Sequence, residues 1–448
     1  MAEAMKHPRG LYILFFTEMW ERFSYYGMRG ILVLFLVATV PDGGLGWEKA
    51  SALSLYGWYT GMVYIMAIPG GILADKVWGQ KHAVMIGGFF IILGHAFLTM
   101  PAVWTFWMGL SCIVLGVGSL KPNISTLVGG LYEEGDVRRD KGFTIFYIGI
   151  NIGALISPLI VGYIGENIGW RIAFGLAGIG MFLGQIIYFR GLKYLRGIGE
   201  ASSSENAKVK IDQSKPLTKI EKDRVVVLLI SFLIIIIFWG AFEQAGGLMN
   251  LYAKEKVDRI FFGWEMPASW LQSANPFFII LLGTFIANFW MKRSQMKKEV
   301  SAIYKMAIGT MIMGSGFLMM NAASLQYDST GTSGVYWLLL AYLLHTIGEL
   351  CASPVALSFI TKLAPVKYAS IMMGIYFAAT GLGNIVAGQL GALSEEAGEF
   401  QIFTGIFIFT TIFGLLLLTL LKKLKAMTHG AEDDKVNGAS GAAPEDAA

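Results

Sequence analysis

Long apolar runs separated by short polar connections fill most of this chain. Runs of the length that a membrane-spanning helix needs, about 20 residues, can be drawn at 11–38, 51–74, 82–100, 103–129, 142–165, 171–190, 225–252, 269–291, 301–322, 334–361, 368–393 and 401–421. The segment 191–224 is too polar to span and leaves six runs on either side. The pattern predicts an all-α membrane protein, a 12-helix bundle with two six-helix halves: an N-terminal bundle at 1–190, a linker at 191–224 and a C-terminal bundle at 225–425.

The polar connections predict the orientation of the spans. Lys and Arg gather in alternate connections, and the other side of the predicted membrane carries only Lys49, Arg171, Lys254, Lys256 and Arg259. Basic connections face the cytoplasm, so we expect both termini and the linker to be cytoplasmic. The segment 426–448 is rich in Ala, Gly and acidic residues, and its composition predicts a disordered cytoplasmic tail.

Composition agrees with a multi-pass protein whose partner is the lipid bilayer. Hydrophobic residues make up 55% of the chain and charged residues 15%, against roughly 25% charge in soluble domains. The net charge of +4 comes from basic residues in connections, so we expect no nucleic-acid partner. Cys112 and Cys351 fall in distant apolar runs, which predicts free buried thiols and no disulfide.

A polar stripe interrupts the first apolar run. Its members recur at the spacing of one helix face: Glu18, Glu21, Arg22, Tyr25, Tyr26 and Arg29. Each central charge costs about 2.5–3.5 kcal/mol on insertion scales, so such residues usually face a bundle interior or a wet cavity and mark a pathway. The alternative is that Glu18 and Arg22, an i, i+4 pair, only tie helices together.

The other charges inside spans differ between the two halves. The first half adds Lys121 to the stripe, whereas the second half contributes the acids Glu243 and Glu349. A cleft between these halves would suit a small zwitterion, with its carboxylate near Arg22, Arg29 and Lys121 and its amine near Glu349. The surplus acid indicates a proton site, because a buried carboxyl group readily holds a proton.

The connection after the second run resembles the signature loop of the major facilitator superfamily. It reads Gly71-Ile-Leu-Ala-Asp75-Lys76-Val-Trp-Gly79-Gln-Lys81, in which glycines permit a tight turn and Asp75 would act in conformational gating; a simple turn is the alternative role. The resemblance implies two six-helix bundles with the substrate between them near the midplane.

Two further motifs narrow the resemblance. The stretch Glu18-x-x-Glu21-Arg22-Phe-x-Tyr25-Tyr26 resembles the ExxERFxYY motif of the proton-dependent oligopeptide transporter (POT) family, and Phe146-Tyr147-Ile-Gly-Ile-Asn151-Ile-Gly153 is similar to its FYxxINxG motif. Tyr64, Lys121, Glu243, Asn275 and Glu349 fall where the family has functional residues. The resemblance covers about residues 8–425. Many bacterial members carry two extra helices between the bundles, which 191–224 cannot supply.

The resemblance implies proton-driven uptake of di- and tripeptides by alternating access. Arg22, Tyr26, Arg29 and Lys121 would hold the carboxylate side of the peptide; Tyr64, Tyr147, Asn151 and Asn275 would hydrogen-bond it; and Glu349 would meet its amine. The proton-coupling residues would be Glu18, Glu21, Arg22, Lys121 and Glu243. It also implies a bacterial cytoplasmic (inner) membrane protein, functional as a monomer, with protons as the coupling ion and no cofactor or metal.

Other functions remain open on the residues alone. A related proton symporter could carry an amino acid, nitrate or a peptide-like compound. We expect no ATP-driven transport by this chain, because the phosphate-binding GxxxxGK[ST] motif is missing from the sequence. We expect no enzymatic activity, because HExxH and GxSxG are missing and no Cys/His metal motif occurs. His345, one turn before Glu349, could carry a proton, but a hydrogen-bonded histidine inside the bundle is the favoured interpretation.

Overall fold

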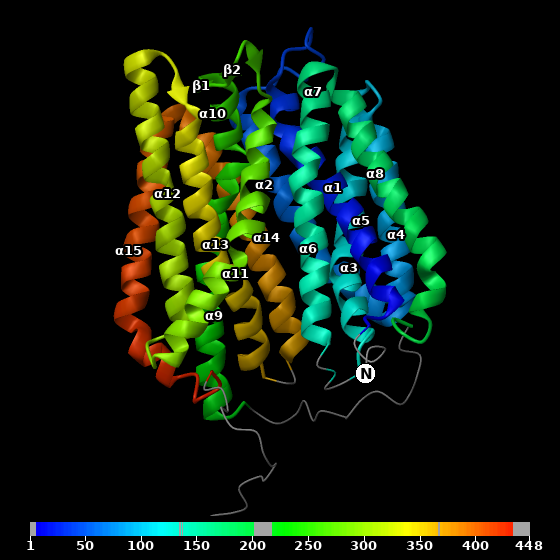
Figure 1. Cartoon of the computed structure of the whole chain (residues 1–448), viewed down its shortest axis with the longest axis vertical. Coiled ribbons are helices and arrows are strands. Elements are labelled where there is room, and N and C mark those ends of the chain that lie inside the picture. Colours follow the sequence, from blue (N-terminus) through cyan, green and yellow to red (C-terminus); the bar gives the residue numbers. More distant parts are fainter. Residues whose placement is uncertain (1–5, 134–135, 137, 201–216, 366–367, 433–448) are drawn as a thin grey trace, which may run out of the picture.

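The computed structural model describes residues 6–133, 136, 138–200, 217–365 and 368–432. Long helices lie side by side along one direction (Figure 1). The first half contains α1 (Arg9–Val37), α2 (Lys49–Ile65), α3 (Ala67–Leu73), the π-helical turn η2 (Ala74–Trp78), α4 (Gln80–Leu98), α5 (Val103–Gly130), α6 (Arg139–Ser157), the π-helical turn η3 (Pro158–Gly162), α7 (Tyr163–Asn167), α8 (Trp170–Gly191) and the 3-10 turn η4 (Leu192–Leu195).

The second half has the same helical character and four short strands. It contains α9 (Lys219–Phe242), the 3-10 turn η5 (Glu243–Ala245), α10 (Leu248–Lys256), β1 (Val257–Asp258), β2 (Ile260–Phe261), β3 (Trp264–Glu265), the 3-10 helix η6 (Ala268–Ser273), α11 (Ala274–Gln295), α12 (Ala302–Thr330), β4 (Ser333–Gly334), α13 (Val335–Leu363), α14 (Ala369–Ala397) and α15 (Glu399–Ala426). Strand β1 pairs in parallel with β4, and β2 forms an antiparallel hairpin with β3.

The predicted spans are present. Ten helices of the described residues are long and apolar enough to cross a membrane. Two predicted spans are not among these ten. Helix α1 has at least three charged residues in every 18-residue window, and a turn at Met66 divides the second span into the shorter helices α2 and α3. With these two segments the predicted twelve spans are complete. The all-α, 12-helix prediction is therefore confirmed.

The polar connections differ from their predicted form. The last part of the predicted linker is helical: α9 begins at Lys219, where Thr218 and Glu221 form a capping box that supplies two of the unpaired donors at a helix start. Helix α12 extends to Thr330, beyond the predicted span, and ends at Gly331 in the left-handed conformation that glycine adopts at helix ends. Residues 201–216 of the predicted linker and 433–448 of the predicted tail lie outside the described residues. The first part of the predicted tail, 426–432, forms the end of α15 and turns, so the prediction of disorder is wrong there: the Ala302 N–H donates to Glu432 Oε1, and Arg224 Nε donates to the Thr428 carbonyl oxygen.

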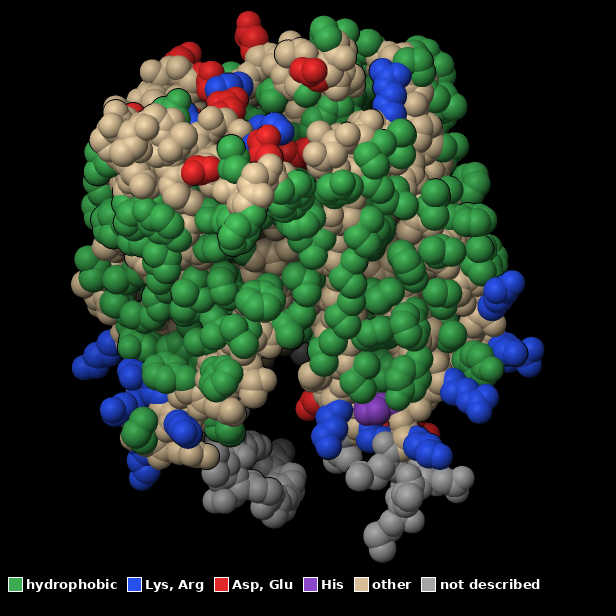
Figure 2. Space-filling view, turned by 45° about the horizontal axis from the view of Figure 1, so that its top comes forward, with side chains coloured by type: hydrophobic (Ala, Val, Ile, Leu, Met, Phe, Trp, Pro, Cys, Tyr) green, Lys and Arg blue, Asp and Glu red, His purple; other side chains and the backbone are tan. Residues whose placement is uncertain are grey.

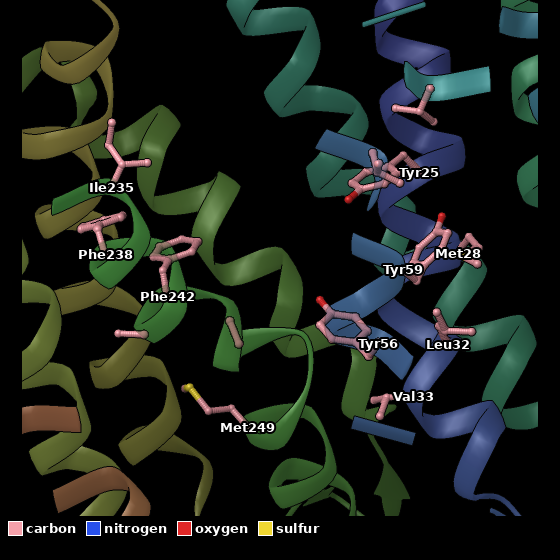
Figure 3. Packing of buried hydrophobic residues seen from close by; sticks show 14 of the residues in the cluster. Tyr25, Met28, Leu32, Val33, Tyr56, Tyr59, Ile235, Phe238, Phe242 and Met249 are labelled. Atoms are coloured by element: carbon pink, nitrogen blue, oxygen red, sulfur yellow. The ribbon is translucent and has the colours of Figure 1, made fainter. Parts of the chain in front are cut away.

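Buried apolar side chains fill each half. Figure 3 shows one group on α1 and α2, including Met28, Leu32 and Tyr59, and a second on α9 and α10, including Ile235 and Phe238. Within the first half α1 packs on α6 and α8, and within the second α12 packs on α13 and α15.

Helices α2 and α14 join the two halves through glycines. A Cβ atom added at Gly57 would lie 2.6 Å from the Cα atom of Gly388, and one added at Gly61 would lie 2.7 Å from the carbonyl oxygen of Gly381. The two backbones therefore touch directly, as small residues permit in membrane helices.

We expect Gly57→Val to destabilise the protein by about 1–3 kcal/mol, the usual cost of overpacking, because the Gly388 backbone cannot retract as a side-chain tip can. Thermal unfolding in detergent measures the effect. Gly71→Ala is the control, since a Cβ atom there would meet nothing within 4 Å. Equal melting temperatures for both variants would contradict the close approach of α2 and α14.

Candidate functional site

A cavity of about 1240 Å³ lies between the two halves. The first half contributes one face of α6, with Tyr147 and Asn151, and the second half contributes α11, α13 and the start of α12. The mouth is lined by Lys297, Lys298, Glu299, Lys362 and Lys425. Figure 2 shows a gap between two lobes at the lower end, where Lys and Arg side chains gather. In this state the molecule is therefore open at its basic end.

The polar stripe of α1 is buried as a cluster of charges. The Nε atom of Arg22 lies 3.0 Å from Oε1 of Glu18 and 2.5 Å from Oε2 of Glu21, and all three side chains are at most 4% exposed. Within the described residues several of their polar atoms have no hydrogen-bond partner, including Glu18 Oε2, Glu21 Oε1 and Arg22 Nη2. A buried charged group without its hydrogen bonds is costly, so the cluster retains capacity to bind a proton or a charged ligand.

Lys121 of α5 joins this cluster. Its Nζ atom lies 3.6 Å from the ring centroid of Tyr64, a cation–π contact, and its charge interacts with those of Glu21 and Glu18. Helices α1, α2 and α5 thus bring together residues that are up to 103 positions apart in sequence, as Glu18 and Lys121 are.

The second half carries a carboxylate held by an amide next to the cavity lining. The Nδ2 atom of Asn275 on α11 donates to Oε2 of Glu349 on α13 at 2.8 Å and to Oγ1 of Thr346 at 3.0 Å. These residues lie one turn from Ile279 and beside Leu350, which line the cavity. On α6, Tyr147 is 43% exposed, and Asn151 Nδ2 donates to the Tyr147 carbonyl oxygen.

Arg29 and Glu243 form an ion pair between the two halves. Nη2 of Arg29 on α1 donates to Oε2 of Glu243 in η5, and Nε donates to the Tyr56 hydroxyl at 2.6 Å. The pair is buried, with side chains 9% and 3% exposed. Arg29, predicted for substrate binding, is therefore occupied by Glu243 and Tyr56 in this state.

Sequence reasoning missed Tyr56. Its hydroxyl contacts Arg29 and lies 3.5 Å from Glu243. The signal was available, because Tyr56 precedes Tyr64 by eight residues, which places both on one side of a helix.

Two other predicted residues lie outside this constellation. Asp75 is exposed in η2 at the basic end of the molecule, so its gating role stays a prediction. His345 is buried against Phe242 and Phe317, and within the described residues neither ring nitrogen has a hydrogen-bond partner. The prediction of a hydrogen-bonded His345 was wrong, because aromatic rings surround it. Cys112 and Cys351 are both free and buried, as predicted.

Comparison with known proteins settles the family. The model of the POT family matches residues 81–211 and 196–406. This chain belongs to the POT family. It is 37% identical to a peptide transporter of Yersinia enterocolitica over 86% of this chain and 88% of that protein, and 35% identical to a di-/tripeptide transporter of Lactococcus lactis subsp. cremoris over 93% and 96% of the two chains.

Solved structures agree with this assignment. A POT family transporter crystallised with a thioalcohol-conjugated peptide superposes with a TM-score of 0.86 at 32% identity, covering 93% of this chain and 97% of that one. The protein is thus a multi-pass membrane transporter with the fold of this family and is not an enzyme.

The Arg29–Glu243 pair predicts a strong non-additive effect on stability. Arg29→Ala leaves a buried carboxylate without its partner, which typically costs about 3–5 kcal/mol, whereas Arg29→Ala with Glu243→Gln removes both charges. We expect the double variant to melt at a higher temperature than Arg29→Ala alone, measured by thermal unfolding in detergent. Additive losses would show that the two side chains do not interact.

Proposed function

We propose that this protein is a proton-coupled symporter that imports di- and tripeptides by alternating access. The observation that carries the proposal is the charge of the two halves: a buried cluster of Arg22, Lys121 and two acids on one half, and Glu349 held by Asn275 on the other. A peptide has a carboxylate and an amine at opposite ends, so it complements both groups. The peptide transporters among the relatives support the same substrate class.

The binding mode follows from the charges. Arg22 and Lys121 bind the peptide carboxylate, assisted by Tyr26, and Arg29 joins them once it leaves Glu243. Glu349 binds the amine. The neutral groups Tyr64, Tyr147, Asn151 and Asn275 hydrogen-bond the backbone between the two ends, where they act independently of the peptide side chains.

Proton coupling follows from the competition for Arg22. Two carboxylates, Glu18 and Glu21, share one guanidinium, so protonation of either acid removes one of the two ion pairs and makes Arg22 more available to the substrate. Lys121 interacts with the same acids and shifts their balance. Protonation of Glu243 would release Arg29 and weaken the contact between the halves at the closed end.

The membrane orientation completes the proposal. The basic mouth of the cavity faces the cytoplasm of a bacterial cell, in agreement with the bias of Lys and Arg, so this state is open to the inside of the inner membrane and both termini are cytoplasmic. One chain holds the whole site, which supports a functional monomer. Protons are the coupling ion, and no metal or cofactor takes part.

We expect reconstituted protein to accumulate labelled dialanine when an inward proton gradient is applied. Arg22→Ala should lower uptake at least tenfold, because the carboxylate loses a charged hydrogen-bond donor. Liposomes without a gradient are the control. If folded protein takes up no dialanine, the substrate is another small solute, such as an amino acid, nitrate or a peptide-like compound, and a competition screen would identify it.

The coupling residues make a separate prediction. Glu18→Gln, Glu21→Gln or Glu243→Gln should abolish uptake driven by the proton gradient but spare counterflow exchange, in which peptide moves down its own gradient without a net proton. Both assays use the same proteoliposomes. Concentrative uptake by all three variants would disprove the assignment of these acids to coupling.

A further inference from the structure

A second contact between the halves lies at the closed end, around Glu166 of α7. Its side chain is 3% exposed. Oε1 accepts hydrogen bonds from the Ser269 backbone N–H at 2.9 Å and from the Ser269 hydroxyl at 2.7 Å, and Oε2 accepts from the Ala268 N–H at 3.1 Å and from Lys254 Nζ at 3.1 Å. All four donors belong to the second half.

The contact continues along η3. A π-helical turn begins at Pro158, which has no N–H to donate, and such turns disturb the regular ladder of helix hydrogen bonds. One carbonyl oxygen in η3 and one at the end of α6 accept side-chain bonds from η6: Leu159 from Trp270 Nε1 at 2.9 Å, and Leu155 from Ser273 Oγ at 2.8 Å. We call this set, from Leu155 to Glu166 and from Ala268 to Ser273, the η6 clasp.

The two parts of the η6 clasp lie close together because the first-half part has a glycine opposite η6. A Cβ atom added at Gly162 would lie 2.0 Å from Ser269 Oγ, so η6 approaches the first half at a distance that another residue would not allow. The clasp also reaches the binding site, because Asn275, which holds Glu349, follows Ser273 by two residues.

The geometry points to Glu166 as a positioning residue of the transport cycle, which holds η6 against the first half and thereby keeps the closed end shut and Asn275 beside Glu349. When the transporter opens at the end that is closed here, η6 must leave α7, and the clasp then loses all its bonds between the halves. Glu166 therefore sets the population of the state closed at this end relative to the state open at this end. The alternating-access part of this inference rests on the proposed function, whereas the closure of this end does not depend on any substrate.

Pairs of spin labels measure the closure directly. The full chain, with Cys112→Ala and Cys351→Ala, receives labels at Ile168→Cys and Thr332→Cys, two exposed positions in connections of the first and second halves beside the clasp end. We expect Glu166→Gln to increase the longer-distance population about tenfold, because the charge-assisted bonds to Lys254 and to the backbone are weakened. Trp270→Phe, which keeps the ring and loses the bond to Leu159, should produce a smaller increase.

Glu255→Gln is the matched control. Glu255 also pairs with a lysine across the two halves, Lys49, at 2.6 Å, but both side chains are about one-third exposed, and such pairs contribute little. An unchanged distance distribution in Glu166→Gln and in Trp270→Phe would overturn the inference, and so would an equal increase in Glu255→Gln.

The KM for transport distinguishes the positioning of Asn275 by Glu166 from a purely structural role of Glu166. If Glu166 positions Asn275, Glu166→Gln should raise the KM for dialanine severalfold relative to Glu255→Gln, because Glu349 loses its aligned donor. A wider closed end together with an unchanged KM would limit Glu166 to closure and overturn the positioning of Asn275. Failure of dialanine uptake in the parent protein would instead count against the proposed function, and the label distances would stand.

Discussion

The structure depends on how charges are held inside a medium that solvates them poorly. Glu18, Glu21 and Arg22 lie within about one turn of α1. The attraction between their opposite charges offsets part of the free-energy cost of removing each charge from water. The compensation is incomplete, since two carboxylates share one guanidinium and several polar atoms have no partner within the described residues. This imbalance is what makes the cluster responsive: one added proton or one bound carboxylate changes which ion pair is favoured.

The same principle operates between the two halves. Arg29 and Glu243 satisfy each other only while the halves are in contact at one end, and the η6 clasp adds a carboxylate whose four donors all come from the second half. At the other end the halves separate around a cavity of about 1240 Å³. Helices α2 and α14 also touch through Gly57 and Gly388. The halves are therefore held together both by polar bonds, which water can replace, and by direct backbone contact, which contains no exchangeable partner.

Sequence patterns predicted the helices well and the contacts between them only in part. The apolar runs located the spans, and the spacing of Glu18, Glu21 and Arg22 predicted a shared face, because both signals are local. The pairing of Arg29 with Glu243 was not predicted, since a charge pattern does not reveal which distant residue lies opposite. The η6 clasp was also missed: Glu166 stood in a predicted connection, and two of its four donors are backbone N–H groups, which cannot be recognised from side-chain identity. The aromatic surroundings of His345 likewise come from two other helices, because Phe242 lies on α9 and Phe317 on α12.

The acceptors at Leu155 and Leu159 have a consequence for how this protein can diverge. Because their main-chain oxygens accept the bonds from Ser273 and Trp270, substitutions of either leucine side chain leave the acceptor in place, whereas most substitutions of Ser273 or Trp270 remove the donor. At these two bonds mutational tolerance should therefore be one-sided, with Leu155 and Leu159 free to vary and Ser273 and Trp270 constrained.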